Sequence, residues 1–418
     1  QKAERERLHN LIRRLVKWEN VNNETLLREA HDEIVKSTGG SPPTILDPFA
    51  GGGTIPLEAQ RLGLNAQGSD LNPVPALKTK ALIEIPPTFA GQPPVFPGAA
   101  DTKLGEWPRA TGLAEDVRRY GAWMREQARE RIGHLYPEAT IVDEKAGLST
   151  PATTIAWIWA RTVTCPNPAC GIEMPLVRSW WLGKKRGREA YVVPTVVHDV
   201  AAVSGRRIDF TIGHDKAKAP SASADGTVGR QGATCVACAS AVDLPYIRAE
   251  GRAGRMGVRL MSVVAEGNRQ RVYIAPTRAD ARAAVVDKPL SAPTSQMPDQ
   301  APSFRVQAYG MVNHSDLFTN RQLVALTTFS DLVSEVRETV LKDAVDAGLP
   351  SGARFAEGGT GAQAYADAVI TYLAMAISKL ADWSSSICSW ISQIEGVRNT
   401  FPRHAIAMTW DYVEINPF

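Results

Sequence analysis

The order of apolar and polar residues gives residues 4–141 an alternating helix and strand pattern. Apolar residues recur with a helical period at 8–18 and 25–36 and again at 113–132, so we expect three helices there. Short apolar runs bounded by Gly, Pro and Asp lie between the second and third helices and predict strands. This alternation predicts an α/β fold for the first part of the chain.

The pattern changes after residue 148. Residues 149–286 contain β-branched runs broken by Gly and by charged turns, which is typical of hairpins. A linker rich in Pro and Ser follows, and two long helical patterns then occupy 320–347 and 362–395. Thr319 and Gln322 have the spacing of a capping box at the start of the first of these helices.

One short segment, residues 44–73, joins a strand, a glycine turn, a helix and a second strand. The first strand ends at Asp47, residues 51–53 are three glycines, and the second strand, 65–69, ends at Asp70. Because the glycines carry no side chains, a ligand can approach the backbone of this turn closely. The order is typical of a nucleoside site, in which the second carboxylate accepts hydrogen bonds from two ribose hydroxyls.

Two classes of ligand compete for this site. A dinucleotide needs a third glycine for its pyrophosphate, but Pro56 stands at that position. S-adenosylmethionine carries no phosphate and needs only the turn and two acids. We expect Asp47 to face its sulfonium or amino end and Asp70 to bind its ribose, so the sequence favours S-adenosylmethionine over a dinucleotide.

Four of the five cysteines form two close pairs inside the β-rich region. Cys165 and Cys170 have C-x4-C spacing, and Cys235 and Cys238 have C-x2-C spacing. Four thiolates suit a structural Zn²⁺ and leave no open position for water. The alternative is two disulfides or four inert thiols, and the absence of a signal-peptide pattern disfavours disulfides. The long separation of the pairs predicts an inserted hairpin lobe, and Cys388 is expected to pack as a small hydrophobe.

A basic hairpin tip lies between the two cysteine pairs. Aromatic side chains beside a cluster of cations suit a phosphate backbone with a stacked base. The alternative is a solvated turn whose tryptophans face a small core. The candidate DNA contacts are Trp180, Trp181, Lys184, Lys185, Arg186 and Arg188.

Several segments resemble a known family. Residues 47–53, Asp-Pro-Phe-Ala-Gly-Gly-Gly, resemble the cofactor motif of amino-group DNA methyltransferases. Residues 68–86, together with 7–30, 314–333 and the cysteine pairs, are similar to the zinc-ribbon-containing adenine-specific DNA methylases of bacteria and archaea. The resemblance covers most of the chain discontinuously.

The resemblance implies a Rossmann-like class I methyltransferase fold, interrupted by a β-rich zinc-ribbon insertion and followed by a helical region. The corresponding domains are 1–148 for the methyltransferase part, 149–290 for the zinc ribbon with a role in DNA recognition, and 291–418 for a linker and helices that lead back to the core. The implied cofactors are S-adenosylmethionine and a structural Zn²⁺. The cofactor contacts expected from the motifs are Asp47, Phe49, Ala50, Gly51, Gly53, Thr54, Asp70 and Asn72.

The implied reaction is methyl transfer to N6 of adenine in DNA, in a modification or phage-defence system with protein partners of its own. That reaction needs a D/N-P-P-Y/F motif to orient the amine, and residues 414–418, "EINPF", hold one proline where two are needed. We therefore expect the catalytic strand beyond residue 418, and we assign no catalytic residue. The alternatives are a non-catalytic zinc-ribbon nucleic-acid-binding module with a degenerate cofactor pocket and, third, a nucleotide-dependent oxidoreductase.

Composition limits these alternatives only loosely. A length of 418 residues predicts two or three domains, and 44% hydrophobic with 22% charged residues is typical of globular proteins. We find no apolar run long enough for a bilayer and no signal-peptide pattern, so we expect a cytoplasmic protein without a membrane partner. The net charge of +3 permits nucleic acid as a partner without arguing for it.

Overall fold

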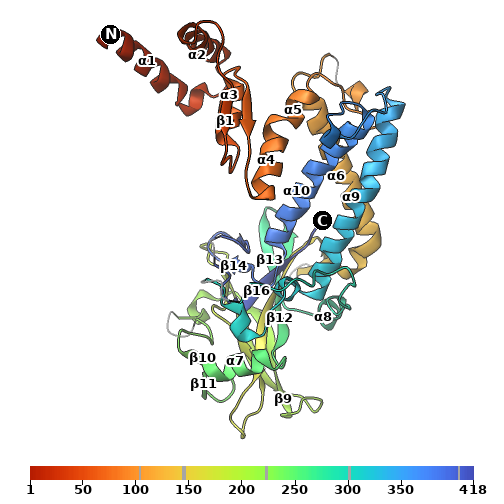
Figure 1. Ribbon diagram of the computed structural model, residues 1–418. Coiled ribbons are helices and arrows are strands. Elements are labelled where there is room, and N and C mark those ends of the chain that lie inside the picture. The colour runs from red at the N-terminus through yellow and green to blue at the C-terminus, as the bar shows by residue number, and fades with distance from the viewer. Residues whose placement is uncertain (103–104, 144–146, 222–224, 300–302, 403–404) are drawn as a thin grey trace. The chain divides into compact units, whose positions relative to one another are not determined.

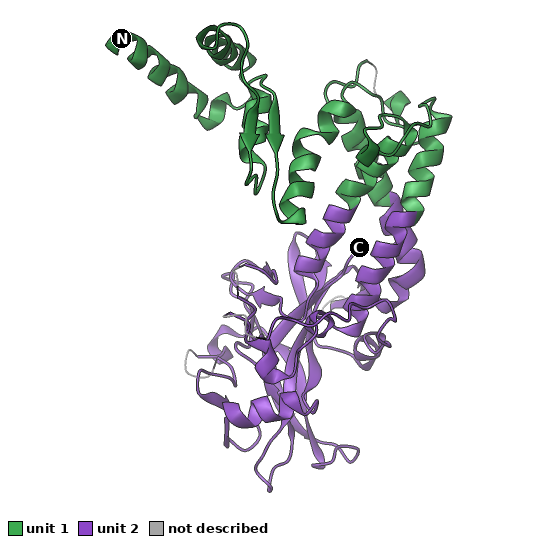
Figure 2. Cartoon of the chain, in the orientation of Figure 1, with its two compact units in different colours: residues 1–122, 335–373 green, residues 123–334, 374–418 purple. Residues whose placement is uncertain are grey.

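The computed structural model describes residues 1–102, 105–143, 147–221, 225–299, 303–402 and 405–418. The chain forms two compact units (Figure 2): residues 1–122 with 335–373, and residues 123–334 with 374–418. The two compact units differ in their bounds from the three domains expected at 1–148, 149–290 and 291–418. Those three domains remain a prediction. Each unit takes residues from two separate parts of the chain.

Helices form most of the chain before residue 133 and between residues 320 and 383 (Figure 1). The α-helices are α1 (Lys2–Leu15), α2 (Glu24–Ser37), α3 (Thr54–Arg61), α4 (Pro73–Ile83), α5 (Ile85–Thr88), α6 (Thr111–Ile132), α7 (Leu244–Arg252), α8 (Arg278–Ala283), α9 (Asn320–Asp346) and α10 (Ala362–Trp383). Short 3-10 helices are Trp18–Asn20, Ala100–Thr102, Gly133–Leu135, Lys216–Lys218, Val306–Tyr309, His314–Leu317 and Phe355–Glu357.

Strands concentrate in the middle of the chain, as the hairpin pattern predicts. They are β1 (Ile45–Asp47), β2 (Ala66–Gly68), β3 (Ala139–Asp143), β4 (Leu148–Ala152), β5 (Thr154–Thr164), β6 (Glu173–Leu176), β7 (Trp181–Gly183), β8 (Ala190–His198), β9 (Arg206–Gly213), β10 (Gly232–Thr234), β11 (Ala241–Asp243), β12 (Gly257–Gly267), β13 (Gln270–Ile274), β14 (Ser389–Ile391), β15 (Gly396–Arg398) and β16 (Asp411–Ile415).

In the first unit, β1 and β2 are parallel and are connected by α3. The register pairs Ile45 with Ala66 and Asp47 with Gly68. The order strand, glycine turn, helix, strand is the predicted one. The Rossmann-like sheet, however, is not shown: within the described residues this sheet has two strands only. The remaining strands pair antiparallel with one another, so none of them extends the parallel pair.

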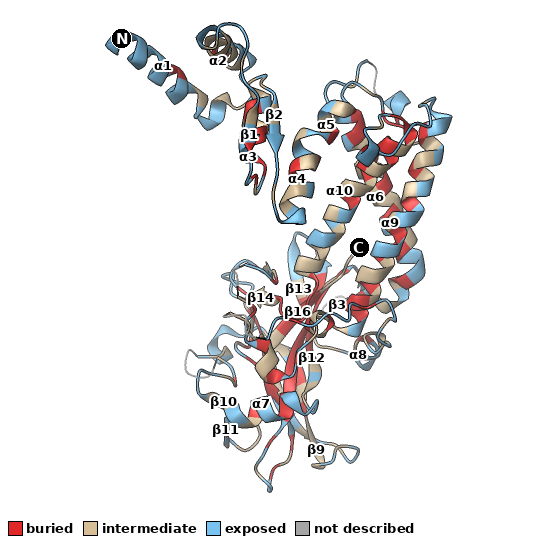
Figure 3. Ribbon diagram, viewed as in Figure 1, coloured by how far each residue is buried: buried red, intermediate tan, exposed pale blue. Residues whose placement is uncertain are grey.

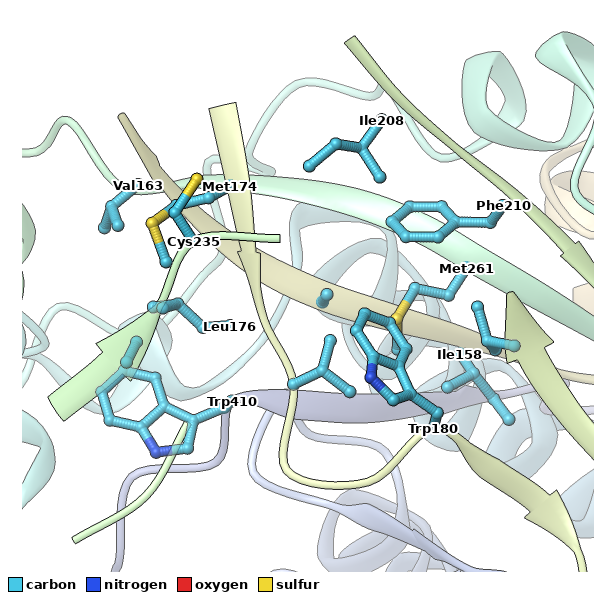
Figure 4. Packing of buried hydrophobic residues seen from close by; sticks show 14 of the residues in the cluster. Ile158, Val163, Met174, Leu176, Trp180, Ile208, Phe210, Cys235, Met261 and Trp410 are labelled. Carbon is cyan, nitrogen blue, oxygen red and sulfur yellow. The ribbon is translucent and has the colours of Figure 1, made fainter. Parts of the chain in front are cut away.

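The second unit contains a five-stranded antiparallel sheet in the order β13-β12-β5-β16, with β6 also paired to β5. The central strand β5 is buried on both faces, because its alternate residues enter two different cores. Figure 3 shows buried residues gathered along the sheet that contains β12 and β16. Ile158 points into the larger core, which also holds the cysteines, while Trp157 and Trp159 belong to the other core. Figure 4 shows Ile158, Trp180, Phe210 and other members of the larger core.

The last strand, β16, was not expected. It runs antiparallel to β5, with Asp411 opposite Ala160 and Ile415 opposite Ala156. The sequence predicts a linker and helices for 291–418, and the helix expected at 362–395 ends before its predicted boundary. The structure ends α10 at Trp383, where the hydroxyl of Ser385 accepts from the N–H of Ile387 at 3.1 Å in place of a helical bond.

Helix α10 also corrects the expectation that no segment could cross a membrane. Among the described helices it alone has the length and apolar composition of a span, and 33% of that apolar stretch is buried inside the protein. The helix carries Asp367, which pairs with Arg337 at 3.0 Å and with Arg354 at 2.7 Å. A paired carboxylate within the helix is typical of a packed core helix.

Candidate metal centre and cofactor turn

The first cysteine pair lies on a tight turn after β5. The backbone N–H of Cys165 donates to the carbonyl of Ile172 at 2.8 Å, and the N–H of Cys170 donates to the carbonyl of Asn167 at 2.8 Å. The side chain of Asn167 accepts from the N–H of Ala169 at 3.0 Å, so its side-chain oxygen and its carbonyl both accept from backbone N–H groups of the turn. Gly171 has a φ of +54°, a conformation that favours glycine.

The second pair lies on an equivalent turn between β10 and β11. The N–H of Cys235 donates to the carbonyl of Ser240 at 2.9 Å, and the N–H of Ala239 donates back to the carbonyl of Cys235 at 2.8 Å. Ala239 has a φ of +59°. Each turn therefore presents two sulfur atoms from one short loop, which is how C-x2-4-C segments supply metal ligands.

The two turns bring all four sulfur atoms together. The Sγ atoms of Cys165 and Cys238 are 3.7 Å apart, those of Cys170 and Cys235 are 4.0 Å apart, and all four lie within 4.8 Å of one another. These separations exclude disulfide bonds, whose S–S length is about 2.05 Å. A tetrahedral site with Zn–S bonds of about 2.3 Å has sulfur–sulfur edges of about 3.8 Å, so the separations of 3.7 and 4.0 Å suit such a site.

The surroundings of the cluster shift the pKa values of its thiols in opposite directions. Burial raises the pKa of the Cys165 thiol to about 12 and also raises the pKa of Cys235. The hydroxyl of Ser240 lies 3.2 Å from the Sγ of Cys238, and this hydrogen bond lowers the pKa of Cys238 to about 6. A metal ion that replaces the protons of these thiols relieves the cost of burying them.

Two further side chains direct N–H groups at the sulfur atoms. The guanidinium of Arg206 donates to the Sγ of Cys170 at 3.7 Å and to its carbonyl at 3.3 Å. The amide of Asn167 lies 3.9 Å from the Sγ of Cys238. Neither residue is predicted as part of the site by the sequence. Asn167 stands between two prolines inside C-x4-C, which is a usable turn signal, whereas Arg206 is distant in sequence and gives none.

The glycine turn of residues 51–53, which we call the cofactor turn after its predicted ligand, is held in place by the carboxylate of Asp70. The N–H of Gly51 donates to Oδ2 of Asp70 at 2.9 Å, and the N–H of Asn72 donates to Oδ1 at 2.9 Å. The two bonds, with that from Asn72 the stronger influence, lower the pKa of Asp70. The structure thus brings together the predicted glycine turn and the predicted ribose ligand, although they are 19 residues apart.

Gly51 and Gly53 of the turn are glycines for different physical reasons. A Cβ atom on Gly53 would lie 2.9 Å from Oγ1 of Thr79 on α4, so packing as well as its φ of +77° requires glycine there. Gly51, with a φ of +50°, faces open space, because a Cβ atom would meet only the carbonyl of Phe49 at 3.8 Å. The side of the turn that a ligand can approach is therefore the side of Gly51.

The other predicted cofactor residues lie around this turn in various settings. Asp47 is buried and accepts from the N–H of Phe49 at 3.2 Å. Asn72 caps α4, because its side chain accepts from the N–H of Val74 at 3.0 Å. Ala50 is buried, and Thr54 is the first residue of α3.

The basic tip follows β7 in the other unit. Trp180 is 6% exposed in the core and lies 6.4 Å from the ring of Phe210 (Figure 4), so this ring matches the alternative of a core tryptophan. Lys184 lies over the ring of Trp181 at 5.0 Å, and Lys185 forms an ion pair with Glu395. The remaining members, Arg186 and Arg188, are exposed at the tip.

Comparison of the chain with protein-family models, with curated proteins and with solved structures finds no match. The family resemblance of the sequence motifs therefore remains a prediction.

Proposed function

We propose that this chain is the cofactor-binding and zinc-binding part of an S-adenosylmethionine-dependent DNA methyltransferase directed at N6 of adenine. The observation that carries the proposal is the hydrogen bond between the Asp70 carboxylate and the N–H of Gly51. It joins the carboxyl ends of two parallel strands, β1 and β2, which is where nucleosides bind in open α/β sheets.

The donors and acceptors of this corner fit an adenosine group. A carboxylate has about four lone-pair sites, so Asp70 can accept two ribose hydroxyls in addition to the two backbone N–H groups that orient it. Its lowered pKa keeps it ionised. Leu71 is fully exposed and Phe49 is 86% exposed, so both offer apolar surface to an adenine ring. S-adenosylmethionine would supply the methyl group; Asp70 and the turn would bind and orient it.

The four-cysteine cluster supports a structural Zn²⁺ in the same proposal. Four cysteine ligands leave no open position, so the ion would hold the two turns together and take no part in the reaction. Arg206 would offset part of the negative charge that four thiolates place on one zinc ion.

The chain's share of the reaction is limited by its sequence. The amino group of adenine is a poor nucleophile, and its activation requires hydrogen-bond acceptors that hold it in line with the methyl group. Residues 1–418 contain no D/N-P-P-Y/F segment. The proposal therefore assigns cofactor binding to this chain, and it assigns amine activation to no residue in it.

Titration calorimetry with S-adenosylmethionine and with NAD tests the proposal. We expect the first to bind and the second to give no heat. Asp70→Ala should weaken binding by roughly 1.5–3 kcal/mol, because the charge-assisted ribose bonds are lost. Asp32→Ala, which removes an exposed carboxylate from α2 in the same unit, serves as the control and should leave the affinity unchanged.

Binding of NAD without binding of S-adenosylmethionine would replace the proposal with the oxidoreductase alternative. Equal affinities of wild type and Asp70→Ala would mean that the ribose lies elsewhere. DNA binding without affinity for either S-adenosylmethionine or NAD would favour the nucleic-acid-binding module, which the cysteine cluster and the exposed Arg186 and Arg188 also suit.

A further inference from the structure

The unit that holds the cysteines contains a separate cavity of about 450 Å³, within the size range of small-molecule sites. Its wall is largely apolar and aromatic and includes Leu244, Phe304, Tyr309, Met408 and Trp410. The rings of Tyr309 and Trp410 meet edge to face, with centroids 5.0 Å apart and an interplanar angle of 90°. The pair fixes one wall of the cavity.

Two arginines, Arg248 on α7 and Arg305, line the same cavity. The guanidinium of Arg248 lies over the ring of Tyr309 at 5.7 Å, and its Nε is buried with no hydrogen-bond partner. Arg305 is exposed. Within the described parts of the chain, neither guanidinium forms an ion pair with a carboxylate.

This arrangement is costly without a ligand. A buried donor that lacks a hydrogen-bond partner is destabilising, and more so where the group is charged. Nearby acids do not relieve it, because Glu250 pairs with Arg255 at 2.6 Å and Asp243 caps α7 through the N–H of Tyr246. Neither guanidinium donates a hydrogen bond to an acceptor in the described parts of the chain, so an anion in the cavity would give the two groups an acceptor that these parts do not supply.

The charge and the walls define the chemistry of that anion. The planar guanidinium fork matches the oxygens of phosphate or carboxylate, and two uncompensated cations suit the two charges of a phosphate monoester better than the single charge of a carboxylate. The aromatic and thioether walls suit a flat, apolar group attached to it. A nucleotide has both parts.

We propose that this cavity binds a nucleotide, with the phosphate at Arg248 and Arg305 and the base against the wall formed by Phe304, Tyr309, Met408 and Trp410. The nucleotide can be a free mononucleotide or one unit of a single strand, since both present the same base and phosphate. This site does not rest on the proposed function, because it shares no residue with the turn around Asp70.

The probes are dAMP, adenosine and the single strand (dA)12, each titrated calorimetrically into the full chain. We expect dAMP to bind at least tenfold more tightly than adenosine. Arg248→Met and Arg305→Met should each weaken dAMP at least tenfold, and Arg248→Lys should restore part of the affinity, because it returns the charge without the fork. Arg282→Met removes an exposed arginine of α8 outside the cavity and should change nothing.

Competition between (dA)12 and dAMP distinguishes a nucleic-acid strand from a free nucleotide as the natural ligand. Competition of (dA)12 with dAMP assigns the site to a nucleic-acid strand, and binding of dAMP without competition assigns it to a free nucleotide. Thermal melting of each variant checks the fold, and the exposed Arg305 gives a variant whose fold should be unaffected. Absence of dAMP binding, equal affinities for wild type and both Met variants, or displacement of dAMP by S-adenosylmethionine would overturn the proposal.

Discussion

At the scale of single residues, the chain places ionisable groups where burial changes their protonation. Asp411 begins β16, and its carboxylate accepts from the N–H of Arg178 at 2.9 Å. Burial raises the pKa of Asp411 to about 7, and the negative charge of Asp225 adds to this rise. Asp199 behaves in the opposite way, because hydrogen bonds from Ala201 and Arg207 lower its pKa. The two acids therefore predict opposite effects of pH on stability.

Asp411→Asn should show the effect of burial. An unfolded aspartate has a pKa of about 3.9, so the folded state of the wild type holds this proton more tightly and loses stability as pH rises through the window from about 4 to 7. The variant lacks this loss. Its free energy of unfolding relative to wild type should rise by roughly 1–3 kcal/mol between pH 5 and 8. This range is set below the full effect of the pKa shift, because the side chain of Asp411 is only half-buried.

Denaturant unfolding at several pH values measures this difference. Asp199→Asn is the control, because a lowered pKa leaves this group ionised in both states above pH 5, so its difference from wild type should stay flat from pH 5 to 8. A flat difference for Asp411→Asn as well would show that its carboxyl group is not desolvated.

At the scale of elements, the sequence predicts well those features that depend on residues close together in the chain, and poorly those that depend on residues far apart in it. Helices α2 and α6 lie where the sequence predicts them, because an amphipathic period is a local property. The capping box at the start of α9 is also confirmed: Thr319 and Gln322 exchange hydrogen bonds of 2.9 and 3.1 Å. Strand β16 was missed, because five residues carry little periodicity and their partner β5 is about 250 residues away in the sequence.

The candidate site divides in the same way. The cysteines and the pair Gly51 and Asp70 were predicted, because each belongs to a short motif with fixed spacing. Arg206 and Arg248 were not, since their roles depend on contacts made only in the folded chain. The local sequence pattern also could not predict that the parallel sheet has only two strands within the described residues, because strand partners are set by long-range pairing.

Strand β16 is joined to α9 by a buried ion pair. Arg321 donates from Nε and Nη2 to the two oxygens of Glu414 at 3.0 and 2.8 Å, and both side chains are at most 1% exposed. Nη1 donates to the carbonyl of Leu135 at 2.9 Å, and the guanidinium lies over the ring of Trp157 at 4.4 Å. The pair is well satisfied, but each partner depends on the other.

Arg321→Met should therefore lower the free energy of unfolding by roughly 3–5 kcal/mol, because it leaves the Glu414 carboxylate buried and unpaired. The double variant Arg321→Met/Glu414→Gln should recover much of this loss, since no buried charge remains. Denaturant unfolding measures both. Lys342→Met removes one partner of the exposed pair with Asp346 and should cost less than about 1 kcal/mol. Equal losses for the single and double variants would contradict this account.

At the scale of the whole molecule, the glycine turn and the four-cysteine cluster belong to different compact units. The segment around the cofactor turn, residues 45–72, lies in the unit of 1–122 with 335–373, and the four cysteines lie in the unit of 123–334 with 374–418. No residue belongs to both sites. Because the two sites share no residue, we expect the metal to stabilise the turns that it joins without affecting ligand binding at the turn around Asp70.

Metal removal tests this independence. The purified chain should contain about one zinc ion, and its removal by a chelator, or the double substitution Cys165→Ser/Cys170→Ser, should shift the melting of the β-rich unit to lower temperature, because the two turns lose the ion that joins them. Affinity for S-adenosylmethionine, measured by calorimetry on the same samples, should stay within twofold of the untreated chain. Cys388→Ser, which replaces a buried cysteine outside the cluster, should retain the zinc. Unchanged melting of a chain shown by elemental analysis to be metal-free would refute the structural role of the cluster, and loss of cofactor affinity with the metal would show that the two sites are coupled.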